Sequence, residues 1–173
     1  SFPFVWNFLK GYQRARIESF LNPTSDPLGS GYNLVQAIIA VGSGQFFGQG
    51  LGRGTQSHLN FLPEQKTDFI FATTAEELGF LGVALLLGLF AFLISRLFIA
   101  LGSVRQTEGS LIIVGVLITL LTQIFINIGM NLGLLPITGI TLPLLSYGGS
   151  SLVSVFALLG LVESVIVVTK HER

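Results

Sequence analysis

The stretch of sequence that decides the fold covers residues 109–162. It reads GSLIIVGVLITLLTQIFINIGMNLGLLPITGITLPLLSYGGSSLVSVFALLGLV and contains no charged residue. Because one membrane-crossing helix needs about 20 apolar residues, this stretch is long enough to cross a bilayer twice. Its middle is rich in Gly and Pro, which interrupt helices. The sequence therefore predicts two spans, at 110–132 and 150–169, joined by a loop at 133–149.

The composition of the whole chain agrees with a membrane protein. Of the 173 residues, 50% are hydrophobic and 10% are charged, a balance that a soluble domain could not cover with polar surface. Lys plus Arg and Asp plus Glu both number 9. This balance, without a basic run, argues against a nucleic-acid partner. The absence of Cys excludes disulfides and thiolate metal sites, and the 2 His make zinc chemistry improbable.

Two further spans are expected upstream. Residues 78–95 are uncharged and lie between Glu76–Glu77 and Arg96, which is long enough for a span, predicted at 78–99. Residues 31–47 are uncharged but rich in glycine, so they predict a short or broken span that lines a cavity. The predicted fold class is all-α, a polytopic transmembrane helix bundle of about four spans with a large extracytoplasmic loop.

The positions of Lys and Arg predict the sides of the membrane, because short cytoplasmic loops carry an excess of positive charge. Four alternating spans place most of the basic residues on one side. This assignment makes 1–30, 100–109 and 170–173 cytoplasmic, and it makes 48–77 and 133–149 extracytoplasmic. The chain begins without Met or a signal-peptide pattern, so we expect it to be a fragment of a longer protein.

The outer segment 48–77 carries Asp68, the main candidate for catalysis. Asp68 is followed by Phe-Ile-Phe, so its carboxylate would enter an apolar helix start at the membrane boundary. Partial desolvation there would raise its pKa and favour proton acceptance. The alternative is that Thr67 and Asp68 cap the helix N-terminus, where carboxylates are also favoured. The residues alone leave both interpretations open.

Two basic residues in the same segment are candidates for binding an anion. Arg53 and Lys66 accompany a glycine-rich stretch, and they could hold a diphosphate through charge and exposed backbone N–H groups. The alternative is a pair of solvated loop charges, because the glycine pattern matches no known nucleotide loop. Glu77 is either an interface charge or part of the same site.

Polar residues inside the predicted spans need partners. Thr119, Gln123, Asn127 and Asn131 are spaced four apart on one side of a helix, so they either bond to neighbouring helices or line a substrate cavity. The string SYGGSS at 146–151 offers hydroxyls and free N–H groups before the last helix, which suits a sugar, an anion or a plain cap. Glu163 is expected to snorkel or to pair with Arg.

Several strings resemble the SEDS family of polytopic cell-wall polymerases, which includes RodA, FtsW and SpoVE. They run through nearly the whole chain in a specific order and spacing. The strings GYN at 31–33 and GTQ at 54–56 resemble the RodA branch of the family more than the FtsW branch. Family members have about ten spans, so the chain resembles their last part. The matching strings include YQ at 12–13, RI at 16–17, DPLGSGY at 26–32, FLPE at 61–64, TDFIF at 67–71, EELG at 76–79 and SYGGSS at 146–151.

The resemblance implies a peptidoglycan glycosyltransferase of the bacterial cytoplasmic membrane, acting in cell elongation, shape or division. Such an enzyme joins lipid II disaccharide units with inversion and releases undecaprenyl diphosphate. It implies a catalytic role for Asp68 and a class B penicillin-binding protein as partner, beside membrane lipids. The residues expected to bind substrate are Gln36, Arg53, Gln56, Lys66, Glu77, Asn127, Ser146 and Ser150.

No metal ligands and no cofactor are expected, although a divalent cation, Mg²⁺ or Mn²⁺, could screen the diphosphate. Two rival functions remain open at this point. One is a lipid II flippase, in which Asp68 would be a group on the transport path. The other is a non-catalytic scaffold of the cell-wall synthesis complex.

Overall fold

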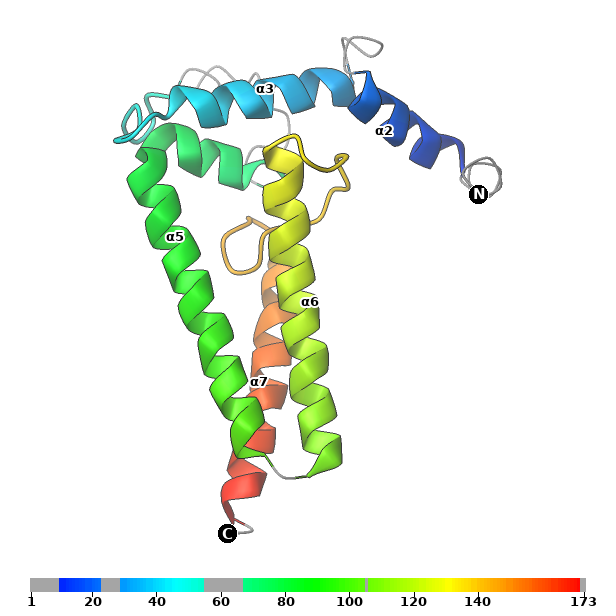
Figure 1. Cartoon of the computed structure of the whole chain (residues 1–173), viewed down its shortest axis with the longest axis vertical. Coiled ribbons are helices and arrows are strands. Elements are labelled where there is room, and N and C mark those ends of the chain that lie inside the picture. The colour runs from blue at the N-terminus through cyan, green and yellow to red at the C-terminus, as the bar shows by residue number, and fades with distance from the viewer. Residues whose placement is uncertain (1–9, 23–28, 55–66, 105, 172–173) are drawn as a thin grey trace.

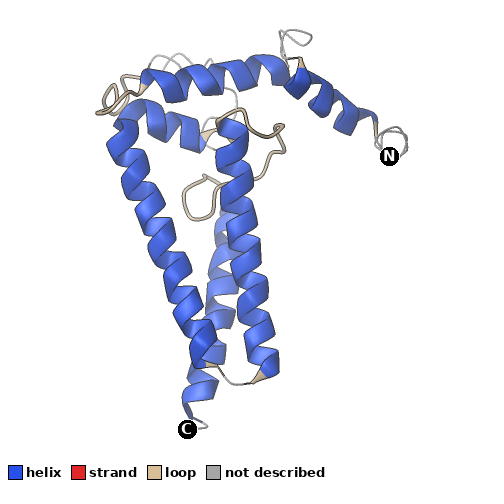
Figure 2. Cartoon of the chain, in the orientation of Figure 1, coloured by secondary structure: helices blue, strands red, loops and turns tan. Residues whose placement is uncertain are grey.

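The computed structural model describes residues 10–22, 29–54, 67–104 and 106–171. Throughout this part of the chain the ordered elements are helices, with no strand (Figure 2). The prediction of an all-α protein is confirmed. The helices are α2 (Gly11–Leu21), α3 (Ser30–Ser43), α5 (Ile70–Ser103), α6 (Thr107–Asn131) and α7 (Gly149–His171).

Among the described helices, α5, α6 and α7 are the three that are long and apolar enough to cross a membrane. They form an elongated bundle and approach one another at the end nearest the C-terminus (Figure 1). A core of buried side chains holds them there, including Leu97 of α5, Leu120 of α6 and Val155 of α7. Outside this core the helices expose many large apolar side chains, as expected where lipid is the solvent. The chain is therefore a multi-pass membrane protein.

Helix α3 is not a fourth span, so the span predicted at 31–47 is wrong. It has 14 residues, about 21 Å of helix, which is shorter than a hydrocarbon core of about 30 Å. It lies across the end of the bundle and not alongside the spans (Figure 1). Part of its apolar composition is explained by packing, because Leu34 and Ala37 are buried. Val35 and Ile38 are exposed.

Without that crossing, helix α2 lies at the other end of the bundle from the one predicted for residues 1–30. Helix α2 packs against α3. Arg16 of α2 donates a hydrogen bond from Nη1 to the carbonyl oxygen of Thr138, between α6 and α7, at 3.0 Å. The described part of 1–30 is therefore on the same side as 133–149. The prediction failed because positive charge indicates sidedness reliably for short loops, and the segment before α5 is long.

Helix α5 is bent at Gly79, where the backbone has φ 64° and ψ −164°. Residues before the bend run beside α3, and residues after it cross the membrane (Figure 1). The turn that follows α3 supplies the hydrogen bonds that the bend removes. The N–H of Phe80 donates to the carbonyl oxygen of Gln45 at 2.9 Å, and the N–H of Gln49 donates to that of Glu76 at 2.9 Å. This exchange fixes the position of the first two turns of α5.

The bend at Gly79 leads to a prediction about folding. Gly79→Ala should strongly reduce the amount of folded protein, because its φ and ψ are strained for residues with a side chain, at roughly 1–3 kcal/mol. A Cβ there would also collide with the backbone nitrogen of Gly48. Gly88 lies in the same helix with open space around it, so Gly88→Ala is the matched control. Melting temperatures in detergent, if equal for the two variants, would contradict this account.

The segment between α6 and α7 turns back into the bundle. Leu142 is fully buried and packs against Phe71 and Phe90 of α5. Phe90 lies about 16 Å along the helix from Gly79, given the rise of an α-helix. Non-helical backbone is tolerated at such depth when protein surrounds it. The segment 132–148 is therefore a re-entrant loop that packs directly under the start of α5.

Candidate functional site

The site is built around Asp68, which lies in the turn immediately before α5. Its backbone carbonyl oxygen accepts hydrogen bonds from Nδ2 of Asn127 at 3.0 Å and from Nδ2 of Asn131 at 3.1 Å. Oδ1 of Asn131 accepts a hydrogen bond from the N–H of Ala72 at 3.2 Å. Both asparagines are fully buried. Helix α6 therefore holds the backbone of Asp68 and the first turn of α5 together.

The re-entrant loop holds the same turn from a second direction. Ser146 Oγ donates a hydrogen bond to the carbonyl oxygen of Thr67 at 2.7 Å and accepts one from the N–H of Leu142 at 2.7 Å. Nδ2 of Asn127 also donates to the carbonyl oxygen of Ile140 at 2.7 Å. Buried polar groups that lose such partners cost stability, so these bonds tie α5, α6 and the loop into one unit.

The side chain of Asp68 is partly exposed, while the neighbouring Phe69 and Phe71 are buried. Its Oδ2 lies 3.4 Å from the point where a Cβ of Gly139 would be. A larger side chain at that position would cover this face of the carboxylate, and the φ of +75° at Gly139 also favours glycine. The arrangement is a fixed carboxylate at the edge of an apolar region, which suits a proton acceptor.

The capping interpretation of Thr67 and Asp68 does not match the start of α5. The N-cap residue is Phe69, one position later, and its carbonyl oxygen accepts the hydrogen bond from the N–H of Thr73 at 3.0 Å. Thr67 and Asp68 therefore precede the capping position. Their backbone carbonyls face the asparagines of α6 and the serine of the re-entrant loop instead.

Asn127 and Ser146, expected to bind substrate, are buried with their polar groups bonded to backbone. This geometry makes them positioning residues for the Asp68 turn. For Asn127 and Asn131, bonding between helices is the interpretation that the structure supports. Thr119 of the same predicted stripe is exposed and donates to the carbonyl oxygen of Gly115 in its own helix at 2.8 Å.

Arg53 and Glu77 lie at the other end of the first part of α5. Glu77 Oε1 accepts a hydrogen bond from the N–H of Gly52 at 3.1 Å, and Arg53 follows in the same turn, exposed. Glu77 is nine residues after Asp68, about 13 Å along a helix. The described structure therefore does not place Arg53 beside the carboxylate of Asp68.

The remaining candidates are less informative. Gln36 is half-buried on α3, and Ser150 is exposed in the first turn of α7, where its carbonyl oxygen accepts a hydrogen bond from Ser154. Gln56 and Lys66 lie outside the described residues. Among the residues that are described, no group of three or more His, Cys, Asp or Glu side chains is placed to hold a metal ion.

Sequence reasoning missed two features of the site. Gly139 lies against the carboxylate of Asp68, although it is 71 positions away in the chain and looks like an ordinary turn residue. Arg16 donates a hydrogen bond to the carbonyl oxygen of Thr138, the residue before Gly139. The signal for Arg16 was present in the string at 12–17 that resembles the SEDS family, but the predicted membrane crossing at 31–47 placed it on the opposite side.

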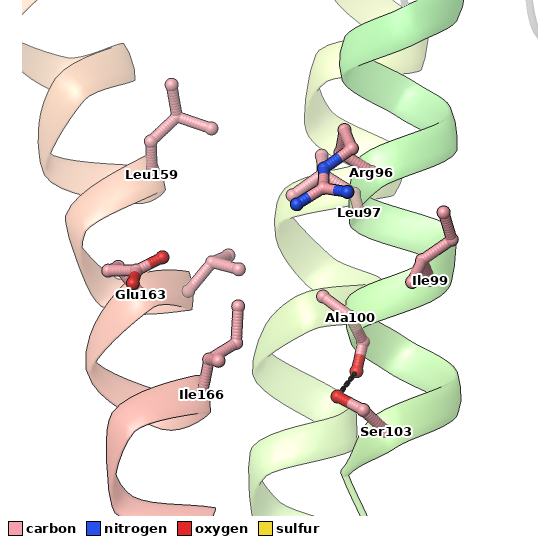
Figure 3. A pocket seen from close by; sticks show the side chains of 9 residues that line it. Arg96, Leu97, Ile99, Ala100, Ser103, Leu159, Glu163 and Ile166 are labelled. Atoms are coloured by element: carbon pink, nitrogen blue, oxygen red, sulfur yellow. Dashed lines mark hydrogen bonds between the residues drawn. The ribbon is translucent and has the colours of Figure 1, made fainter. Parts of the chain in front are cut away.

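A separate groove of about 310 Å³ opens between α5 and α7 at the other end of the bundle. Arg96 of α5 and Glu163 of α7 line it from facing helices, beside Ser103, whose hydroxyl donates to the carbonyl oxygen of Ala100 (Figure 3). Glu163 and Arg96 are both exposed and line the same groove, and the expected pairing of Glu163 with an arginine stays a prediction. Arg96 lies about 25 Å along the helix from Gly79, so this groove is distinct from the Asp68 site.

These features define a class: a helical membrane protein whose buried asparagines fix an acidic turn at one end of its spans. Comparison with known families then gives the membership. A profile of the FtsW/RodA/SpoVE family, described as cell cycle proteins, matches residues 2–171. The chain belongs to this family, and the SEDS resemblance of its sequence is confirmed.

Several curated relatives are similar over most of this chain. It is 48% identical to peptidoglycan glycosyltransferase MrdB of Escherichia coli (strain K12) over 164 residues, which cover 94% of this chain and 44% of MrdB. It is 50% identical to stage V sporulation protein E of Bacillus subtilis (strain 168), covering 89% of this chain and 42% of that protein. The chain therefore spans less than half the length of these relatives.

A solved structure is also similar. It belongs to work described as the structural coordination of polymerization and crosslinking by a peptidoglycan synthase complex. The match has a TM-score of 0.72 at 38% sequence identity and covers 96% of this chain and 44% of that chain. The helical arrangement described above is therefore similar to that of the matched chain over the matched part.

Proposed function

We propose that the complete protein is a peptidoglycan glycosyltransferase that polymerises the disaccharide units of lipid II and releases undecaprenyl diphosphate. The observation that carries this proposal is the partly exposed carboxylate of Asp68, whose backbone is held by two buried asparagines at the edge of the apolar bundle. Relatives at 46–48% identity that are named peptidoglycan glycosyltransferases support it.

In this reaction Asp68 accepts the proton of the acceptor sugar's 4-hydroxyl. The hydroxyl oxygen forms a bond to the anomeric carbon of the donor, and the bond from that carbon to the diphosphate oxygen breaks. The electron pair of the broken bond leaves with the diphosphate, and the configuration at the anomeric carbon inverts. One general base is enough, because a diphosphate leaves without an acid partner when cations screen its charge.

An apolar groove near the site supports a substrate with a lipid tail. The groove has a volume of about 280 Å³ and opens where α5 bends. Phe71 and Val83 of α5 and Ile128 of α6 are among its lining residues. Phe71 is three residues from Asp68, so a polyprenyl chain in this groove would keep its sugar near the carboxylate.

We assign the Asp68 end to the extracytoplasmic face of the bacterial cytoplasmic membrane. The opposite end carries the short α5–α6 connection and the end of α7, and the sequence of these two segments contains Arg105, Lys170 and Arg173. Short basic segments of this kind favour the cytoplasm. A class B penicillin-binding protein is the proposed partner, and the similarity to a subunit of a peptidoglycan synthase complex supports it.

The experiment that tests this function uses the protein in its complete natural length, purified in detergent with labelled lipid II and no other polymerase. Glycan chains resolved on a gel are the expected product. A parallel experiment in liposomes measures movement of labelled lipid II across the membrane. Lipid movement without any glycan product would replace the polymerase with a transporter. Neither product nor movement, with cell growth intact in an Asp68→Ala strain, would indicate a scaffold.

A further inference from the structure

We infer that the groove between α5 and α7 binds the headgroup of a zwitterionic phospholipid with a primary ammonium group, a phosphatidylethanolamine of the leaflet far from Asp68. The groove is distinct from the Asp68 site, so this inference goes beyond the proposed function. The ligand is a bilayer lipid and not a reactant, and the groove therefore takes no part in the proposed polymerisation.

Opposite charges line the groove from facing helices. Arg96 of α5 and Glu163 of α7 are both exposed and border a volume of about 310 Å³ (Figure 3). Ser103 of α5 donates its hydroxyl hydrogen to the carbonyl oxygen of Ala100 at 2.7 Å, which leaves its hydroxyl oxygen as an acceptor in the groove. A ligand with one sign of charge would meet one unfavourable side chain. The lining therefore complements a ligand that carries both charges.

A phosphatidylethanolamine headgroup has the matching pair of charges. Its phosphate is negative, and two methylene groups separate the phosphate from a primary ammonium. The planar guanidinium of Arg96 has five N–H donors and can bind two phosphate oxygens. The ammonium has three N–H donors, for which the carboxylate of Glu163 and the hydroxyl oxygen of Ser103 are acceptors. Both ends of the headgroup then form charge-assisted hydrogen bonds.

The two charges also lie at the depth of a lipid headgroup. Measured along α5 from the bend at Gly79, a hydrocarbon core of about 30 Å ends about three residues beyond Arg96. Glu163 is about 12 Å from the end of α7 at His171. A charge at the bilayer centre is costly, whereas long side chains near the boundary reach the headgroup region. The charged part of the groove is therefore within reach of phosphate and ammonium groups.

The rest of the groove is apolar and has a fixed base. Leu97, Ala100 and Val162 are buried in the core that joins the three spans, and they also line the groove. Ile99 and Leu159 line it as well, so the first part of an acyl chain contacts apolar side chains. A base that is packed before the lipid arrives lowers the entropy lost on binding.

Two other described grooves lack this combination of charges. One, of about 360 Å³, is lined by apolar side chains and a glycine of α6 and the segment after it, including Leu121 and Phe125. The other, of about 280 Å³ at the bend of α5, has Gln45 as its one polar lining side chain. Neither has a charged lining residue to distinguish one headgroup from another. Of these three grooves, the one between α5 and α7 is the one that fits a zwitterion.

The test measures binding of phosphatidylethanolamine, phosphatidylcholine and phosphatidylglycerol, with identical acyl chains, to the complete protein in detergent by native mass spectrometry. The natural protein should bind the ethanolamine lipid about 10-fold more tightly than the glycerol lipid, which has no cation for Glu163. The choline lipid should bind roughly threefold or more weakly than the ethanolamine lipid, because its ammonium has no N–H donor. These comparisons need no variant, so they do not depend on the folding of one.

Two substitutions assign the preference to the groove. Glu163→Gln should weaken binding of the ethanolamine lipid about 10-fold and strengthen binding of the glycerol lipid, because the negative charge is removed. Arg96→Gln should weaken binding of both lipids about 10-fold. Glu108→Gln is the matched control, since Glu108 is an exposed carboxylate in the first turn of α6, outside the lining of the groove. This control should bind all three lipids as the natural protein does.

Several outcomes would overturn the inference. Equal binding of the three lipids by the natural protein would do so, and so would an unchanged preference in a Glu163→Gln protein that elutes as folded. If the natural protein binds none of the lipids, another part of the protein covers the groove and the inference also fails. A preference that both substitutions abolish, in a protein that makes no glycan, would support the lipid site and contradict only the polymerase proposal.

Discussion

Asp68→Asn is expected to lower the rate of glycan polymerisation by a factor of about 10² to 10⁴, the usual contribution of a general base. The substitution keeps the size and shape of the side chain. It leaves the backbone carbonyl that Asn127 and Asn131 hold unchanged, so the turn should keep its position. The expected loss is therefore chemical and not structural. The measurement is the initial rate of glycan formation from labelled lipid II by the complete protein.

Glu163→Gln is the matched control for this prediction. It also replaces a carboxylate by an amide, but in the groove between α5 and α7 at the other end of the bundle. We expect its polymerisation rate to stay within roughly twofold of the natural protein, as is usual for changes away from a site. A similar rate for Asp68→Asn and Glu163→Gln would remove the base from the proposed reaction.

The second large effect is expected from Asn131→Ala. This change removes the donor to the carbonyl oxygen of Asp68 and the acceptor for the N–H of Ala72. Each buried group left without a partner costs about 1–3 kcal/mol. A shift of the base by about 1 Å is enough to lower the rate roughly 10²-fold. We therefore expect a lower melting temperature in detergent and a fall in kcat with little change in KM.

Thr119→Val serves as the control for Asn131→Ala. Thr119 is on the same helix and in the same predicted polar stripe, but it is exposed and bonds to its own helix at Gly115. Its replacement should change neither the melting temperature nor kcat appreciably. If Asn131→Ala behaved like Thr119→Val, the buried bonds of α6 would not be what positions Asp68.

The sequence identified Asp68 but did not identify the bonds that hold its backbone. The TDFIF string drew attention to Asp68 through its apolar neighbours and through the resemblance. Asn131 was visible as a polar residue in a span, but both bonding to a neighbouring helix and lining a substrate cavity were possible for its side chain. The structure decides between them because the partner of Asn131 is a backbone group 63 positions earlier in the chain. No local pattern specifies a pairing across that separation.

The treatment of 31–47 shows a different limit. Apolar composition was interpreted as a membrane crossing, and this error reversed the side on which Arg16 lies. Helix α3 has apolar residues on both faces: one face packs on α5, and the other is exposed at the end of the bundle. A count of apolar residues does not distinguish this case from a span. Length does, since 14 residues are too few to cross a bilayer.

The sequence by itself determined that this protein spans a membrane with α5, α6 and α7, because long uncharged runs have no other stable environment and a helix satisfies its own backbone. It also determined Asp68 as the acidic residue at the edge of an apolar helix. The tertiary structure decided which residues surround that carboxylate. Gly139 lies against it, Asn131 and Ser146 hold the backbone of its turn, and Arg16 bonds to the residue before Gly139. These contacts join distant segments, so they depend on how the helices pack, which no short stretch of the chain encodes.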